Sequence, residues 1–115
     1  MFQLRRVFII LFLLTSLVVN ARLRYVSTTG TDGASGDITH PWRTWQYGFY
    51  TAVVGDTVYF RGGVYYSTGP IIIDPRYNQG HNGTPSSYIC FFNYPGEVPI
   101  LDCSRHTCSP NYGIY

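Results

Sequence analysis

Residues 54–65 read Val-Gly-Asp-Thr-Val-Tyr-Phe-Arg-Gly-Gly-Val-Tyr, and this stretch decides the fold. Its Gly-Asp pair predicts a turn, and the β-branched and aromatic residues 57–61 that follow predict a strand. The Gly-Gly pair interrupts that strand, and residues 64–66 resume an extended backbone. The stretch therefore predicts two short strands that meet at a glycine corner.

Further short apolar segments of the same character lie on both sides of this stretch, at residues 25–27, 71–73, 88–94 and 99–102. Segments 58–60 and 89–92 are centred about thirty residues apart. Short strands that recur at such a distance and are joined by turns are typical of a chain that winds coil after coil around one core. A small sandwich has similar strands, so the spacing alone leaves both architectures open.

Residues 45–53 predict the one helix of the chain. Thr44 is a suitable N-cap, because its hydroxyl can accept from a free N–H of the first turn. The apolar residues at helical spacing are Trp45, Phe49, Ala52 and Val53. We expect this helix to cover the exposed first coil as an N-terminal cap. Trp42 or Trp45 could instead stack on sugars, although an aromatic stripe at helical spacing packs more often in a core.

The first 21 residues read as a secretory signal peptide. Two arginines precede residues 7–19, which carry no charge, and Ala21 ends a suitable cleavage site. Thirteen residues rise only about 20 Å as a helix, which is short of the roughly 30 Å of a bilayer core. A single-pass anchor is the alternative, because Arg22 and Arg24 follow immediately and can hinder cleavage. The expected division is thus residues 1–21, cleaved after Ala21, and a secreted domain at 22–115 with no membrane span.

The charge of the domain argues against a nucleic-acid partner. All 8 basic residues of the chain are arginines, against 6 acidic residues, and the net charge is +2. Two of the arginines lie in the signal peptide, so the remainder is neutral. A nucleic-acid-binding protein needs a basic stripe. The 12 glycines and 7 prolines favour turns and short strands over long helices.

Three cysteines follow the signal peptide, and secretion exposes them to an oxidising compartment. Cys103 and Cys108 enclose a short turn and are the most plausible disulfide pair. A partner beyond residue 115 is the alternative for one of them. Zinc binding by this pair together with His106 would have only three ligands at poor spacing. Cys90 lies in an apolar run, and we expect a small buried side chain.

Three stretches, the first and last with gaps, carry a resemblance to a known family, at residues 25–46, 54–65 and 83–102. Together they resemble the start of secreted pectate-lyase-like proteins, in particular the polysaccharide lyase family 9 group and its uncharacterised relatives. The resemblance implies an all-β fold, a right-handed parallel β-helix, of which this chain holds the capping α-helix and first coils. A repeat fold needs about three units for a continuous core, so we expect the chain to stop within a longer domain and to be marginally stable alone.

The resemblance also implies an activity. Such lyases act on acidic polysaccharides, with calcium held by an aspartate cluster and with a basic residue, typically lysine, as the base. Those groups lie on later coils, and this chain has no lysine and only scattered acids. We therefore assign no catalytic, cofactor-binding or metal-binding residue here, expect this part to be inactive alone, and place any calcium in the full-length protein. The alternative is a non-catalytic extracellular β-helix that binds carbohydrate through exposed tyrosine and tryptophan.

Several single residues could take part in binding or catalysis, but each has a simpler structural interpretation. Arg61 could hold a uronate carboxylate in a bidentate contact, but a structural role at the strand end is favoured. Asp32 and Asp37 could suggest a calcium loop, but turn chemistry explains both. Asp56 and Asp102 match positions of the family pattern and are interpreted as turn and coil-end hydrogen-bonding groups. The only bases that titrate near neutrality are loop histidines: His40, His81 and His106.

The signal-peptide interpretation predicts a defined N-terminus. When the chain is expressed from Met1 in a secreting host, intact-mass measurement of the secreted protein should show that it begins at Arg22. A secreted product that retains Met1 would contradict this interpretation.

Overall fold

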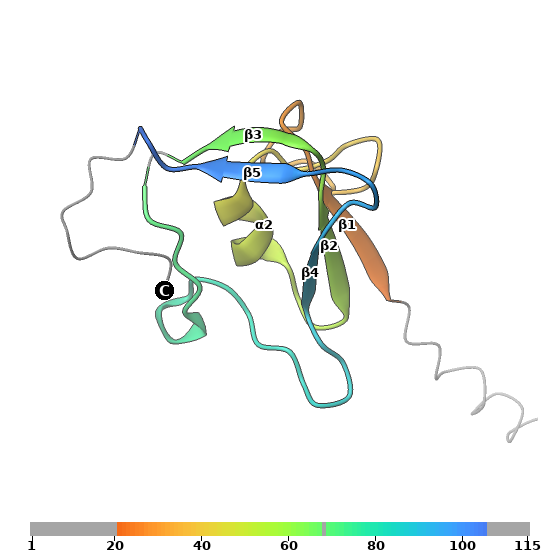
Figure 1. Cartoon of the computed structure of the whole chain (residues 1–115). Helices are drawn as coiled ribbons and strands as arrows, with labels where there is room; N and C mark the ends of the chain where they lie inside the picture. Colours follow the sequence, from red (N-terminus) through yellow and green to blue (C-terminus); the bar gives the residue numbers. More distant parts are fainter. Residues whose placement is uncertain (1–20, 68, 106–115) are drawn as a thin grey trace, which may run out of the picture.

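The computed structural model describes residues 21–67 and 69–105, and all the strands in this part pair in parallel (Figure 1). Sheet A has the order β1-β2-β4 and consists of β1 (Arg22–Val26), β2 (Asp56–Phe60) and β4 (Cys90–Asn93). Sheet B pairs β3 (Gly63–Tyr66) with β5 (Pro99–Asp102). None of the helices in this part has the length and apolar character needed to cross a lipid bilayer.

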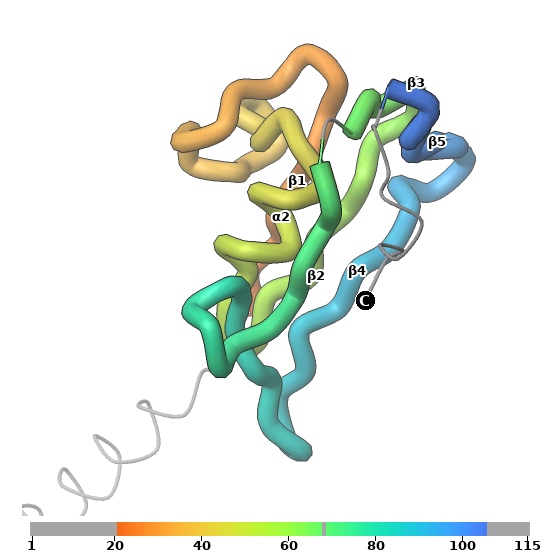
Figure 2. Tube along the Cα trace, turned by 90° about the vertical axis from the view of Figure 1, so that its left-hand side faces the viewer, coloured from red at the N-terminus to blue at the C-terminus, as the bar shows by residue number. Residues whose placement is uncertain are grey.

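The chain winds in coils. After β2 it turns at the corner formed by Arg61 and Gly62 into β3, and after β4 it turns again into β5. Each passage through a sheet adds one strand beside its predecessor, which is the parallel arrangement in Figures 1 and 2. The expectation of parallel strands wound around one core is thereby confirmed, and the sandwich alternative is wrong.

Side chains along the strands alternate between a core face and an outer face of sheet A. In β2, Val58 and Phe60 are almost fully buried, whereas the residue between them, Tyr59, is only partly buried. Val26 of β1 pairs with Phe60 and is also fully buried. Among the described residues, the buried members of the core cluster are Val26, Trp42, Ala52, Val58, Phe60 and Tyr65.

Helix α2 (Trp45–Thr51) fills the inside of the coil (Figure 1). Thr44 is its N-cap, as predicted, and accepts from the backbone N–H of Tyr47 at 3.1 Å. The ring centroids of Trp45 and Phe49 lie 4.6 and 5.5 Å from that of Phe60. At Gly48 the helix contacts β1 so closely that an added Cβ would lie 2.9 Å from a Val26 methyl group. The glycine that weakens the helix thus permits its packing.

A loop, not this helix, covers the outer edge of β1. The backbone N–H of Tyr25 donates to the carbonyl of Gly36 at 2.8 Å, and that of Ser27 donates to the carbonyl of Trp42 at 2.8 Å. The N–H of Trp42 returns a bond to the carbonyl of Tyr25 at 2.9 Å. These bonds pair polar groups that would otherwise leave an open sheet edge. The role of α2 as an N-terminal cap stays a prediction.

Two local expectations were wrong. Residues 71–73 form no strand, because the side-chain amide of Gln46 binds the backbone of Ile72, accepting from its N–H at 3.0 Å and donating to its carbonyl at 3.3 Å. Cys90 is only partly buried, because it pairs in register with Thr57 on the outer face of sheet A. The predicted turn before β2 closes through Asp56, whose carboxylate accepts from the N–H of Val53 at 3.0 Å.

The division of sheet A into two faces predicts losses of stability of very different size for the same substitution at two phenylalanines. Phe60→Ala removes a side chain that is 4% exposed and should cost about 3–5 kcal/mol of unfolding free energy. The matched control, Phe92→Ala, removes one that is 54% exposed and should cost about 0.5 kcal/mol or less. Urea unfolding followed by circular dichroism measures both, and equal losses would contradict the assigned faces.

Candidate functional site

The outer face of sheet A carries a row of aromatic rings, which we call the aromatic face: Tyr25, Tyr59, Phe92 and Tyr94. The first three are register partners on β1, β2 and β4. Ring centroids are 6.0 Å apart for Tyr25 and Tyr59 and 6.3 Å apart for Tyr59 and Phe92. Tyr94 follows β4 and lies 6.2 Å from Tyr25 and 6.0 Å from Tyr59. The rings therefore form one continuous surface across three strands.

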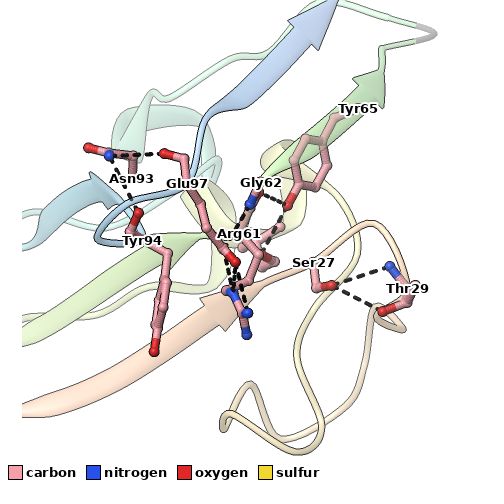
Figure 3. Close-up of polar contacts among 9 residues, drawn as sticks. Ser27, Thr29, Arg61, Gly62, Tyr65, Asn93, Tyr94 and Glu97 are labelled. Carbon is pink, nitrogen blue, oxygen red and sulfur yellow. Dashed lines mark hydrogen bonds and ion pairs between the residues drawn. The ribbon is translucent and has the colours of Figure 1, made fainter.

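A bidentate ion pair between Arg61 and Glu97 borders the aromatic face (Figure 3). The guanidinium donates from Nε to Oε2 at 2.8 Å and from Nη2 to Oε1 at 2.9 Å. The backbone N–H of Gly62 donates to the same carboxylate at 3.1 Å. The guanidinium carbon lies 4.3 Å from the ring centroid of Tyr94. The pair thus joins the corner after β2 to the corner before β5.

These contacts shift the pKa values of both Arg61 and Glu97. The hydrogen bonds from Arg61, and then that from Gly62, lower the pKa of Glu97 to about 2. The same pairing with Glu97 raises the pKa of Arg61. Tyr65 supports the corner from inside, because its hydroxyl donates to the carbonyl of Arg61 at 2.6 Å and lies 3.1 Å from that of Val26. Burial is the main cause that raises the pKa of Tyr65 to about 12. None of these groups is poised to exchange a proton near neutral pH.

Arg61, considered from the sequence as a ligand for a uronate carboxylate, is occupied by Glu97. The structural interpretation at the strand end is therefore confirmed. Both tryptophans also contribute to core packing. Trp42 is 3% exposed, with its indole N–H donated to the carbonyl of Ala34 at 2.9 Å, and Trp45 packs on the core.

The four aspartates act within turns and coil ends, as predicted. Asp32 accepts from the hydroxyl of Thr44 at 2.7 Å, and Asp102 accepts from the N–H of Ser104 at 2.8 Å. The hydroxyl of Ser35 is the main contact that lowers the pKa of Asp37 well below its usual range. Asp56 is 2% exposed and lies 3.3 Å from the guanidinium of Arg22.

The described residues do not fit a calcium site of the kind that the resemblance implies for the full-length protein. In residues 21–67 and 69–105, no three histidine, cysteine, aspartate or glutamate side chains gather closely enough to hold a metal ion. His40 and His81 are exposed, and His40 contacts Asp37 at 3.3 Å. His106 lies outside the described residues.

The remaining sequence-based sites lie at the limits of the described chain. Ala21, the predicted cleavage position, is exposed and directly precedes β1. Cys103 is exposed, whereas Cys108 lies outside the described residues. The disulfide between Cys103 and Cys108 therefore stays a prediction, as does the signal peptide.

Sequence reasoning missed the aromatic face, although a signal for it exists. Tyr25 and Tyr59 are 34 residues apart, and Tyr59 and Phe92 are 33 apart, so one coil separates each ring from the next. An aromatic residue at the same position of successive coils predicts a ladder once the strands are known to be parallel and in register. Glu97 was also missed, because 36 residues separate it from Arg61.

Parallel strands that return to the same two sheets coil after coil, around an apolar interior, define the class of parallel β-helix proteins. Residues 24–115 match the family model described as "Pel9A-like, right handed beta helix region". The chain belongs to this Pel9A-like β-helix family.

One similar curated protein is the pectate lyase PEL9 of Emericella nidulans, at 37% identity over 78 residues. That alignment covers 68% of this chain and 18% of the relative, so the chain spans less than a fifth of the relative's length. Among solved structures, a rhamnogalacturonan lyase has a TM-score of 0.62 at 22% identity over 76% of this chain and 23% of the other. A glycoside hydrolase has a TM-score of 0.59 at 20% identity, over 71% of this chain and 15% of the other. These structural likenesses support the fold alone.

The Arg61–Glu97 pair predicts a pH-dependent contribution to stability. Because the pKa of Glu97 is about 2 in the folded chain and 4.5 is its ordinary value, the pair stabilises the fold above pH 4.5 and loses this effect as the pH falls towards 2. The difference in melting temperature between the wild type and Glu97→Gln should therefore be largest above pH 5 and vanish near pH 2. Other carboxylates titrate in both proteins and cancel in this difference.

Thermal melts across this pH range measure the effect, and Arg61→Gln provides the second arm of a double-mutant cycle. The two single substitutions and the double substitution should lower the melting temperature by similar amounts, because each removes the same interaction. Additive losses, or a difference between wild type and Glu97→Gln that does not change with pH, would show that the pair does not act as a unit.

Proposed function

We propose that this chain is the N-terminal part of a secreted, pectate-lyase-like β-helix protein that acts on acidic polysaccharide. Membership of the Pel9A-like family and the similarity to a protein named as a pectate lyase support this proposal. The catalytic groups, and calcium if the full-length protein uses it, would lie on coils beyond residue 115. The covered edge of β1 suits a segment that begins such a domain, with the loop and α2 together closing its first coil.

The observation that carries the proposal is the aromatic face. Tyrosine and phenylalanine rings offer flat apolar surfaces, and the C–H groups of a sugar ring can pack on them. Tyrosine hydroxyls can also exchange hydrogen bonds with sugar hydroxyls. Three rings in register, with 6.0 and 6.3 Å between neighbouring centroids, form a surface that runs across the strands. An extended polymer that follows the long axis of a β-helix would cross the strands in this direction.

The aromatic face is expected to bind the polymer through its sugar rings more than through its charge. The guanidinium nearest to it, that of Arg61, already has both donors of its fork on Glu97. A polysaccharide carboxylate would have to displace Glu97 to use this arginine, and would then leave that carboxylate without its partner. The aromatic face alone therefore positions a polysaccharide without selecting strongly for its acidic groups.

A second candidate function is carbohydrate binding without catalysis, and the same aromatic face favours it, because stacking needs no reactive group. The two candidates differ in one assay of the full-length protein. Calcium-dependent release of unsaturated products from polygalacturonate would support the lyase. Binding without such release, across a range of acidic polymers, would support the binding protein.

Substitutions on the aromatic face test its role. Tyr59→Ala and Phe92→Ala should each weaken retention of the protein in gels that contain polygalacturonate, by about two- to tenfold in the dissociation constant. Tyr77→Ala is the matched control, because Tyr77 is 74% exposed but lies outside the aromatic face, and it should leave retention unchanged. Unchanged retention of the Tyr59 and Phe92 variants would place polymer binding elsewhere.

A further inference from the structure

A cavity of about 410 Å³ lies between the start of α2 and sheet B, and no residue of the aromatic face lines it. Its size falls within the range of roughly 300–1,000 Å³ that is usual for small-ligand sites. The lining includes arginines, aromatic rings and hydroxyl groups, among them Arg43, Arg105, Trp45, Tyr66, Thr28 and Ser67. Four separate segments of the chain thus contribute to it.

The charges of the described chain are distributed unevenly around this cavity. Four described arginines form ion pairs with acidic side chains: Arg22 and Arg24 with Asp56, Arg61 with Glu97, and Arg76 with Asp74. Arg43 and Arg105 form no such pair with any acidic side chain in residues 21–67 and 69–105, and both line the cavity.

The acids closest in sequence to these two arginines are engaged by other groups. Asp32 accepts from the backbone N–H of Arg43 at 2.8 Å and does not pair with its guanidinium. Asp102 accepts from Ser104, which is the main cause that lowers its pKa, while the charge of Arg105 contributes less. Both guanidinium groups are therefore available to an external anion. Asp102 partly compensates the positive charge of Arg105.

The aromatic lining narrows the class of anion. The guanidinium carbon of Arg105 lies 3.6 Å from the ring centroid of Tyr66, which forms a flat cationic and aromatic surface. Trp45 lines the same cavity from the start of α2. A small inorganic anion would use the arginines alone, whereas a sugar that carries a carboxylate would use the arginines and the apolar walls together.

We infer that this cavity is a second saccharide site, separate from the aromatic face, and that it binds an acidic sugar residue whose carboxylate is held by Arg43 and Arg105. The sugar ring packs against Trp45 and Tyr66. The choice of a uronate as the acidic sugar rests on the proposed function. The site itself rests on the lining of the cavity. The two sites have different roles. The aromatic face stacks on the sugar rings of a polymer, and the cavity selects a charged end.

Titration of the full chain with digalacturonate, followed by tryptophan fluorescence and calorimetry, tests this inference. Saturable binding is expected, with a shift in the fluorescence of Trp45. Arg43→Gln and Arg105→Gln should each weaken it about tenfold, which corresponds to the loss of one charge-assisted hydrogen bond. Arg76→Gln, which removes an exposed arginine outside the cavity, is the matched control and should have no effect. A neutral galactose disaccharide should not bind, and inorganic phosphate should not compete at equal concentration.

The outcomes separate this site from the aromatic face. Loss of digalacturonate binding in the arginine variants, with binding retained in Tyr59→Ala, supports the cavity. Digalacturonate binding that is absent, or that is unchanged in both arginine variants, overturns the inference while leaving polymer retention on the aromatic face as a separate result. Equal competition by phosphate would also overturn it, because the cavity would then be a simple anion site.

Discussion

The parallel pairing of β1, β2 and β4 in one register is the constraint on which the rest of the structure depends. It places Val26, Val58 and Phe60 inside and leaves Tyr25 and Tyr59 outside. Because side chains alternate with a period of two, a slip of one residue would exchange these faces. The core and the aromatic face are therefore two consequences of the same hydrogen-bond ladder.

Other features hold that register in place. Gly48 lets α2 approach Val26, and the aromatic rings of α2 then cover the inward side of sheet A. The loop that ends at Trp42 pairs the outer edge of β1, so the ladder has a defined first strand. The Arg61–Glu97 pair connects corners that belong to successive coils. Each contact joins segments far apart in the sequence, as a coiled architecture requires.

The sequence predicted what depends on neighbouring residues. Thr44 as the N-cap and the strands on either side of Gly62 follow from local propensity, and the structure confirms them. Partners from distant segments could not be predicted in this way. Residues 71–73 have the composition of a strand, but Gln46 binds the backbone of Ile72. Likewise, Arg61 has the chemistry of a carboxylate-binding residue, and only the fold shows that its carboxylate is that of Glu97.

The most direct test of this account is the set of proton–proton contacts of the Tyr59 ring in solution, measured by nuclear Overhauser spectroscopy of the labelled chain. The account predicts contacts from the Tyr59 ring to the rings of Tyr25 and Phe92 on the neighbouring strands. Contacts from Tyr59 to the helix residues Trp45 or Phe49 would contradict it, because they would place that ring in the core and exchange the two faces of sheet A.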